Sequence, residues 1–434
     1  MQNQLSVIVD TLSITPTKGG NPVDLSGGFV SFEYYESLFS PHITAYLTIL
    51  DTGSVSSKTD TQERPADVVS ALPIRGNDAL SIILCHPTGR LIFGTAGLQD
   101  YPLKVKKVST LGVDKNKKVI NLQLVSPIAL DNIGKPFKGE FHAQGTLSNT
   151  VTKLLTNLIG TDYPSRIINV DPTSNSLEFK LSSGAIKYLD KIIDLATQSV
   201  SKSGVPGFFF WESYKGVNFK STQELMSAAA SGDYYHGSGN PDRDAGNNRM
   251  LASNEVREFD ILSSMTAGAF KTDVITWNPF THEYTEKSFS LSDANFSTMG
   301  SEDLPSFYDS AGVSSRTMSF ILNPGNSSIG LSTSLNNDPI KWAALSNMRY
   351  NSLFNQEIQV AVPLNLGLQA GQTINLNFPR ISQEKIEEGV LDQSKSGKYL
   401  ILHLSHKFTN TPQRGSTTHM SLIRDTSGLH KGEE

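Results

Sequence analysis

The stretch of sequence that decides the fold runs from Phe32 to Asp51 and reads FEYYESLFSPHITAYLTILD. Apolar and polar residues alternate on both sides of Ser40-Pro41-His42, which has the composition of a turn. Alternation with a period of two is typical of a strand that buries one face. The sequence therefore predicts two strand-like runs, 29–32 and 44–50, on either side of this turn.

The same spacing of residues recurs later in the chain. The opening phrase and its copy lie 227 positions apart: Phe32-Glu33, Ser37-Leu38 and Leu47, then Phe259-Asp260, Ser264-Met265 and Val274. A closing phrase and its copy lie 298 positions apart: Tyr101, Leu103, Leu122, Leu124 and Val125, then Tyr399, Ile401, Met420, Leu422 and Ile423. We interpret the two phrases as one structural unit used twice, with chance recurrence of strand periodicity as the alternative.

The composition limits both the architecture and the kind of partner. A chain of 434 residues is too long for one compact core, and about two to four domains are expected. Charged residues make up only 18% of the chain, and 37 basic against 42 acidic residues give a formal net charge of -5. This balance excludes a nucleic-acid binder that is cationic overall, although it leaves local basic patches open.

A single cysteine and a polar N-terminus further limit the class of protein to which the chain can belong. Cys85 alone cannot form an internal disulfide or a multi-cysteine metal site, and the run 81–85 predicts a buried, inert thiol. Residues 1–4 carry no basic or apolar segment, so no secretory signal is expected. No apolar run approaches the roughly 20 residues that span a bilayer. We expect a protein that is made in a cytoplasm and has no membrane segment.

The first half predicts a β domain followed by a small α/β domain. Residues 1–126 alternate short strand-like runs with polar turns, which is typical of an antiparallel barrel or sandwich. Within 127–226, apolar residues recur at helical spacing over 146–159, where Gly160 marks the end, and again over 186–196. The aromatic run Phe208–Trp211 begins a hairpin that turns at Gly216, and we expect this run in the core.

The second half predicts a longer version of the same β domain. Its segments, in order, are a polar linker at 227–249, the second β domain at 250–294 and 355–426, an insertion at 295–354 with a helix from Asp338-Pro339, a charged loop at 382–398 and a polar tail at 427–434. The expected fold class is α+β, predominantly antiparallel β.

The residues that usually carry chemistry are scattered. His403 and His406 lie three apart on a predicted strand, so they point to opposite faces and cannot hold one metal ion. Asp242–Gly246 lacks the third oxygen ligand before the glycine and the distal Glu of a calcium loop, and Gly232, Gly237 and Gly239 lack the strand–turn–helix context of a dinucleotide site. No catalytic, metal or cofactor residue is therefore predicted, and paired carboxylates for glycoside hydrolysis stay open.

Six lysines gather on one predicted hairpin: Lys104, Lys106, Lys107, Lys115, Lys117 and Lys118. Lysine on a strand edge is a common device against aggregation, so a solvated edge is one interpretation. A contact with an acidic neighbour or with nucleic acid is the other.

Three parts of the chain resemble the baseplate hub proteins of contractile-tailed phages. Phe32–Asp51 is similar to their first domain, and Phe208–Phe219 is similar to the aromatic hairpin of their second domain. Residues 398–401 and 422–425 are similar to their C-terminal hairpin. The resemblance follows the order of the chain and covers most of it, while 227–249 and 295–340 match least.

The resemblance implies a trimer in which each chain carries two tandem tube-type β-barrel domains with small α/β accessory domains. Three chains would present six similar units around a channel, with the six-fold tail tube on one face and the three-fold spike on the other. The related hub of type VI secretion spikes is fused to its spike. This chain shows no β-helical repeat, so its spike is expected to be a separate protein. The family contributes no catalytic residue and no cofactor.

The resemblance also implies partners and a location. The expected partners are further copies of the chain, the spike protein, the tail tube or tube-initiator protein, baseplate wedge proteins and the tape measure protein, with DNA only in transit. The expected location is the tail baseplate of the virion, after assembly in the host cytoplasm. A tail-associated carbohydrate-active or lectin-like β protein is one alternative, and the hub of a non-phage contractile injection system is another.

Overall fold

The computed structural model describes most of the chain. The described residues are 7–19, 21–52, 55–59, 62–66, 74–94, 100–114, 117–135, 141–160, 162–163, 166–176, 179–181, 187–236, 248–258, 260–279, 281–294, 296–300, 316–321, 339–381, 386–410 and 415–428.

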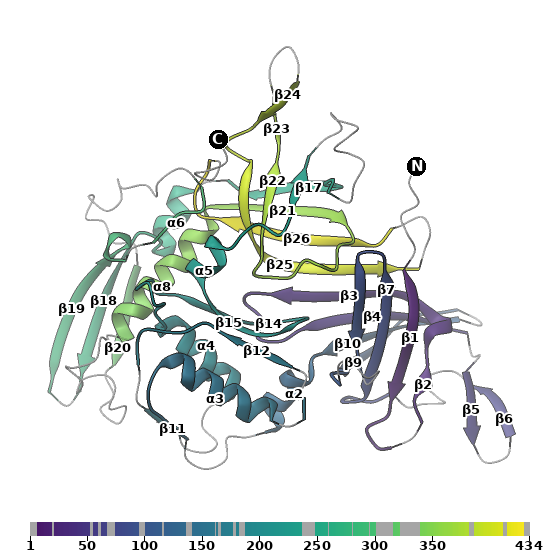
Figure 1. Cartoon of the computed structure of the whole chain (residues 1–434). Helices are drawn as coiled ribbons and strands as arrows, with labels where there is room; N and C mark the ends of the chain where they lie inside the picture. Colours follow the sequence, from purple (N-terminus) through teal and green to yellow (C-terminus); the bar gives the residue numbers. More distant parts are fainter. Residues whose placement is uncertain are drawn as a thin grey trace.

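Fourteen strands form one sheet. Those from the first part of the chain are β1 (Ile8–Thr15), β2 (Val23–Asp24), β3 (Phe29–Ser37), β4 (Thr44–Asp51), β7 (Ala79–His86), β8 (Gly89–Phe93), β9 (Leu103–Asp114) and β10 (Lys117–Val125). Those from the second part are β16 (Asp233–Tyr235), β17 (Ala252–Arg257), β21 (Gln356–Pro363), β22 (Thr373–Asn377), β25 (Gly397–Thr409) and β26 (Thr417–Arg424). Figure 1 shows β17, β21, β26, β25, β3 and β4 stacked one above another, which is also their hydrogen-bonding order.

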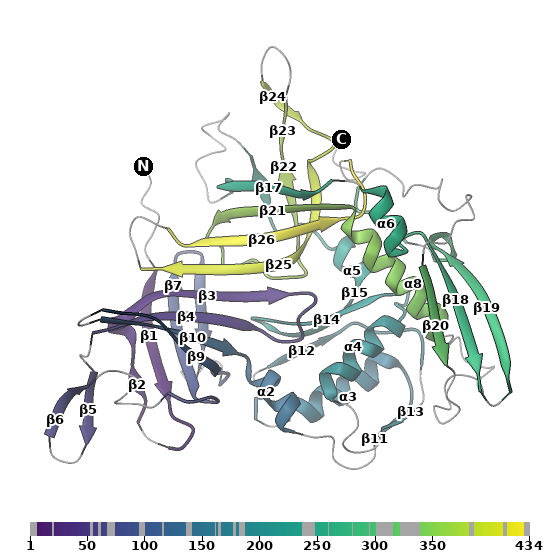
Figure 2. The ribbon, with the colours of Figure 1, turned by 180° about the vertical axis from the view of Figure 1, so that it is seen from behind.

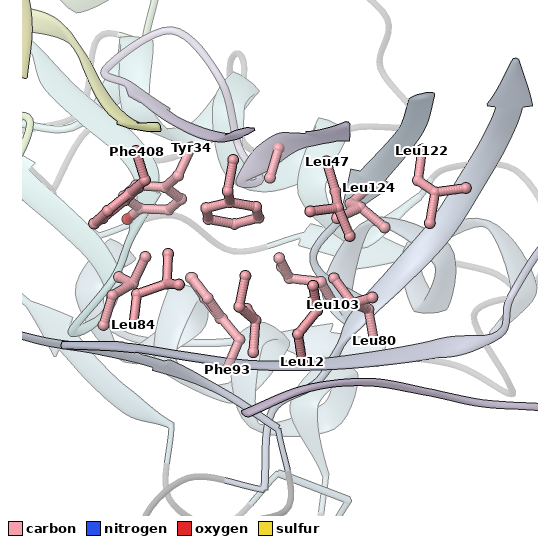
Figure 3. Packing of buried hydrophobic residues seen from close by; sticks show 14 of the residues in the cluster. Leu12, Tyr34, Leu47, Leu80, Leu84, Phe93, Leu103, Leu122, Leu124 and Phe408 are labelled. Carbon is pink, nitrogen blue, oxygen red and sulfur yellow. The ribbon is translucent and has the colours of Figure 1, made fainter. Parts of the chain in front are cut away.

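The largest core lies between two layers of strands. Phe32 and Tyr34 alternate with outward residues along β3, as the period-two pattern of this segment predicts. Figure 3 shows side chains of one layer, among them Leu47 and Leu124, facing side chains of the other, among them Leu12. A further member of this core is Phe408, which comes from β25 near the other end of the chain (Figure 3). Two distant parts of the sequence therefore share one core.

A second core fills the part of the sheet made by the second half. It contains Ile358 and Val360 of β21, Tyr399 of β25, and Met420 and Leu422 of β26. Each fully buried apolar side chain of this size contributes about 1.5–3 kcal/mol to folding. Among the described strands no sheet closes into a barrel, so the two tandem tube-type barrels stay a prediction.

The segment predicted as an α/β domain contains four helices and two small sheets. Its elements are α2 (Pro127–Gly134), β11 (Phe141–Ala143), α3 (Leu147–Ile159), β12 (Ile167–Val170), β13 (Phe179–Leu181), α4 (Tyr188–Gln198), β14 (Phe208–Ser213), β15 (Gly216–Ser221) and α5 (Thr222–Ser227). Figure 2 shows α2, α3 and α4 on the same side of β12 and β14. Thr146 caps the start of α3 by accepting from the Asn149 amide, and Gly160 ends it with a positive φ of 59°. Both predicted helices of this segment are confirmed.

The aromatic run on β14 is buried on both faces. Phe208 and Phe210 pack in a core with residues of α3 and α4. Phe209 and Trp211 pack in another core with residues of β25 and β26. The prediction that this run belongs to the core is confirmed, and β14 joins the α/β segment to the large sheet.

The remaining elements flank the sheet. They are α6 (Ile261–Ala267), β18 (Lys271–Asn278), β19 (Glu283–Ser290), β20 (Arg316–Ile321), α8 (Pro339–Ser352), and the hairpins β5 (Val55–Thr59) with β6 (Gln62–Ala66) and β23 (Pro379–Ile381) with β24 (Ile386–Leu391). α8 confirms the helix predicted from residue 339, while its expected cap, Asp338, lies outside the described residues.

The prediction that the opening phrase is repeated from residue 259 onward is wrong. Its residues 260–265 begin helix α6, whereas the original lies on β3. The physical reason is local, because the Asp260 carboxylate accepts from the Ser263 amide as a helix cap and Gly268 ends the helix in the left-handed region. Val274 lies on β18, in a separate three-stranded sheet, and Phe259 lies outside the described residues. The spacing of apolar residues recurred without the strand.

Three smaller expectations also differ from the structure. The stretch expected as a polar linker contains β16, which pairs in parallel with β22 and buries Tyr234. The stretch expected as a charged loop contains β24, which pairs with β23. Cys85 lies on β7 but is only half-buried, and its sulfur accepts from the Arg90 guanidinium at 3.2 Å. It is therefore not the core thiol that the apolar run predicted.

Candidate assembly surface

The order of strands repeats within the sheet. β3, β4, β10, β9 and β7 are neighbours in that order and form what we call the first unit. β17, β21, β26, β25 and β22 are neighbours in the same order and form the second unit. Gln123 pairs with Tyr46 and Lys107 in the first unit, and Ser421, 298 positions later, pairs with Gln359 and His403 in the second.

With β10 and β26 matched at that spacing, the pairing places Ile401 at the position of Val105, two residues from Leu103, its partner in the closing phrase. Both closing phrases form antiparallel hairpins, β9 with β10 and β25 with β26. The duplication predicted from the closing phrases is confirmed as a pair of equivalent hairpins, but the match of Tyr101 and Leu103 with Tyr399 and Ile401 is wrong by two residues. The counterpart of β3 in the second unit is β17, which replaces the phrase that the sequence suggested.

The two units are joined because β25 changes its partner along its length. Residues 397–400 pair with β22 inside the second unit. After a bulge at residues 401–403, residues 403–409 pair with β3 of the first unit. On the outer face of this junction, Lys407 Nζ lies 2.5 Å from Glu33 Oε1. Burial alone would raise the pKa of Glu33, but the Lys407 ammonium and the Tyr35 hydroxyl outweigh it and lower the pKa.

His406 lies on the buried side of the same junction. Its ring stacks on Tyr34 of β3 with centroids 5.9 Å apart. Nδ1 contacts Thr418 Oγ1 at 2.9 Å, and Nε2 lies 3.3 Å from the Leu368 carbonyl. Burial lowers the pKa of His406 to about 4, so the ring is neutral at pH 7. His403 is exposed on the opposite face of the strand, as the period-two pattern predicted.

The outward side of the sheet is polar and hollowed over both units. One hollow of about 530 Å³ lies over the first unit and is lined by Glu33, Tyr35, Tyr46 and Asn121 together with Ser and Thr residues. A second hollow of about 560 Å³ lies over the second unit and the junction. Its lining includes Ser253, Gln359, His403, Ser405 and His419. Both hollows therefore present hydroxyl and amide groups, and the second adds imidazole groups.

A buried ion network fastens the first unit to the α/β segment. Glu212 of β14 and Arg166 form an ion pair at 2.8 Å, with side chains 0% and 3% exposed. The Glu212 carboxylate also accepts from the Tyr101 hydroxyl at 2.6 Å and from Ser126 Oγ. The Ile43 amide donates to it at 3.0 Å. A buried charge is tolerated only with such partners, so these residues fix how the two parts pack.

A second buried carboxylate, Glu36 on β3, connects three parts of the chain. It accepts from the Tyr34 hydroxyl, from the Tyr214 amide in the turn between β14 and β15, and from the Ala370 amide between β21 and β22 at 2.8 Å. Burial raises the pKa of Glu36 to about 7, although these donors and Arg166 oppose the shift. One residue of these two buried networks could have been found from the sequence: Glu212, which directly follows the aromatic run of β14.

Other described residues that the sequence singled out do not line these two hollows. Within the described ranges no three His, Cys, Asp or Glu side chains come together as a metal site. Asp242–Gly246, Gly237, Gly239 and Lys115 lie outside the described residues. The other five lysines of the predicted cluster lie on β9 and β10. No helix in the described part of the chain has the length and apolar character needed to cross a membrane.

Comparison with solved structures identifies the fold. The tail protein from Neisseria meningitidis MC58 superposes with a TM-score of 0.55 and 8% identity, covering 97% of each chain. The 43 kDa tail protein of prophage MuSo2 from Shewanella oneidensis superposes with a TM-score of 0.53 and 11% identity, covering 96% of this chain and 98% of the other. The chain has the fold of these tail proteins.

The remaining comparisons add less. The E. coli c3393 protein, described as a type VI secretion component similar to T4 tail proteins gp27 and gp5, superposes with a TM-score of 0.44 and 10% identity over 97% of this chain and 79% of that one. A likeness at that level carries no weight for the role of this chain. No family model matches the sequence. No curated protein matches it. The tail-protein fold agrees with the resemblance to baseplate hub proteins that the sequence indicated.

Proposed function

We propose that the chain is the structural hub of a contractile tail baseplate. It would act as a trimer that adapts the six-fold tail tube to the three-fold central spike, with a channel for genome passage and with no enzymatic activity. The observation that carries the proposal is the repeated strand order, because three copies of a chain with two equivalent units supply six equivalent units. The shared fold of two tail proteins supports the same role.

The proposal assigns parts of the chain to parts of the assembly. The two units correspond to the two tandem tube-type barrels expected at 1–126 and at 250–294 with 355–426. The polar face would line the channel, since its hydrogen-bonding groups and the mutually paired charges of Glu33 and Lys407 would let a polyanion pass with little attraction. The partners would be a separate spike protein, the tail tube or its initiator, wedge proteins and the tape measure protein. Assembly in the host cytoplasm would place the chain in the virion baseplate.

Light scattering and negative-stain imaging test this function. We expect a mass of three chains and ring-shaped particles, alone or beside the spike protein. A strict monomer at high concentration, with no ring even in the presence of the spike protein, would reject the hub. If rings form, the neighbouring genes distinguish a phage from another contractile injection system.

A further inference from the structure

We propose that the edge of β9 in one copy pairs with the edge of β17 in a second copy, just as β25 pairs with β3 inside one chain. This inference rests on the proposed trimer and names the contact that would hold it together. It also assigns a role to the lysine cluster, which the hub function alone leaves unexplained.

β9 has the geometry of β25 without its last partner. Leu103 and Lys104 pair with β7, and Val105 exchanges backbone hydrogen bonds with Asn77 and Asp78 at 2.8 and 2.9 Å. From residue 106 to residue 114, β10 is the one strand neighbour of β9 in the described chain. The corresponding part of β25 continues by pairing with β3. A row of backbone groups on such an edge is a template for one more strand.

β17 has the geometry of β3 without its outer partner. Asn254 pairs with Gln359, as Glu33 pairs with Tyr46 in the first unit. In the part of the chain that the structure describes, β17 has a strand neighbour, β21, on one side. Its outward residues are exposed, including Val256 at 48%. The missing neighbour of β17 is therefore a strand that occupies the place of β25, and β9 is that strand in another copy.

The internal junction fixes the register of the proposed contact. Lys407 pairs with Glu33 there. Lys407 also pairs with Thr417, and Gly112 pairs with Val119, 298 positions earlier. Gly112 is thus the counterpart of Lys407 and is expected opposite Asn254, the counterpart of Glu33. The strands run antiparallel, so the start of β9 meets the end of β17.

The charges on the two edges are complementary in this register. The start of β9 carries Lys104, Lys106 and Lys107, and the end of β17 is followed by Glu258. Carrying the junction register onto β9 and β17, with the bulge between Glu255 and Arg257 counted, places Glu258 opposite Val108, next to Lys107 along β9. Glu255 already forms an ion pair with Lys395 at 2.7 Å, so Glu258 is the better residue to test. A second copy of this chain therefore fits the edge by backbone pairing and by charge.

A charge swap tests the contact. We expect Lys107→Glu and Glu258→Lys each to weaken self-association on the order of tenfold at low salt, as measured by sedimentation equilibrium. The double variant should restore the affinity of the wild-type chain, because the pair is re-formed with its signs exchanged. Lys153→Glu on the exposed side of α3 is the matched control and should leave the affinity unchanged.

A cross-link tests the register. Directly opposed residues on antiparallel strands lie about 4.5–5.5 Å apart at Cα, which a disulfide can span. In a Cys85→Ser background, Gly112→Cys combined with Asn254→Cys should give covalent dimers and trimers under mild oxidation. An added side chain at Gly112 meets no atom within 4 Å. Lys153→Cys combined with Asn254→Cys is the control and should give none.

The outcomes separate this inference from the hub proposal. Restoration by the double swap together with the covalent trimer supports the edge contact. Trimers that persist unchanged in both single swaps and give no cross-link overturn the edge contact while the hub proposal stands. A wild-type chain that remains monomeric under all conditions overturns both. Circular dichroism identifies any charge-swap variant that fails to fold. In that case the cross-linking result alone decides whether the edge contact exists.

Discussion

The two units of the sheet share a strand order but differ in what supports them. The first unit closes over its own core, where β1, β7 and β8 cover the strands opposite. In the described part of the chain the second unit has the short β22 and β16 at that place, and it packs against β14 through a core that includes Trp211, Leu400 and Ile423. The hairpins therefore set the strand order of each unit, whereas the strands that pack against and support each unit come from different parts of the chain.

The largest effect should come from breaking the tie between the first unit and the α/β segment. Arg166→Ala leaves the Glu212 carboxylate buried without its cation, and we expect a loss of about 3–5 kcal/mol in the free energy of unfolding, measured with urea. Lys135→Ala is the control, because its ion pairs with Asp131 and Asp162 are exposed and worth less than about 1 kcal/mol. Equal losses in the two variants would show that the network does not hold the parts together.

Corresponding core positions in the two units should each matter and should act independently. Leu124→Ala and Leu422→Ala remove fully buried side chains from separate cores, and each should cost about 2–4 kcal/mol. The loss in the free energy of unfolding of the double variant should equal the sum of the two single losses to within about 0.5 kcal/mol. A larger deviation in urea unfolding would mean that the two units unfold through one shared core.

Acid should weaken the junction between the units. The pKa of His406 is about 4 in the folded chain against 6.5 for an unperturbed histidine, so its contribution to stability is present above pH 6.5 and is lost as the pH falls towards 4. We expect a loss of about 1–3 kcal/mol and lower hydrogen-exchange protection factors in β25 and β3 at pH 5 than at pH 7. His406→Asn should abolish that pH dependence, and an unchanged acid response in this variant would contradict the assignment.

Glu36 should act with the opposite sign in the same range. Its pKa is about 7 in the folded chain against 4.5 for an unperturbed glutamate. Its contribution to stability is therefore present below pH 4.5 and is lost as the pH rises through 7, by about 1–3 kcal/mol. Glu36→Gln should make stability rise more steeply between pH 5 and pH 7 than in the wild-type chain. An identical slope in urea unfolding would show that Glu36 does not titrate there.

The smallest effect should come from the outer face of the junction. Lys407 and Glu33 are partly exposed, at 42% and 25%, so Lys407→Ala should cost about 1 kcal/mol or less. High salt should reduce even this difference. If Lys407→Ala lowered the free energy of unfolding more than loss of the His406 contacts does, the outer ion pair would hold the units together, rather than the stacking of His406 on Tyr34.

Local signals in the sequence predicted much of this fold. Thr146 and Gly160 bounded one helix, and the closing phrases gave two hairpins that occupy equivalent places. The copy of the opening phrase failed because Asp260 and Gly268 favour a helix, and apolar spacing alone does not exclude one. The sequence could not show that β9 and β17 have unpaired edges, since a strand is recognised as an edge strand only when its neighbours in the sheet are known. Arg166 and Glu212 lie 46 positions apart, and no spacing rule connects them.

One strand has a consequence for how the chain reaches its native state. β25 supplies side chains to three cores, among them Phe408 to the first, Ile401 to the second and Leu402 to the third. It reaches its neighbour β3 across more than 360 residues of sequence. During synthesis β3 therefore waits with one unpaired edge until more than 360 further residues have been made, which exposes it to premature pairing with other nascent chains. The hairpin of β25 and β26 completes the cores of both units together, so these two cores should form late and in one step.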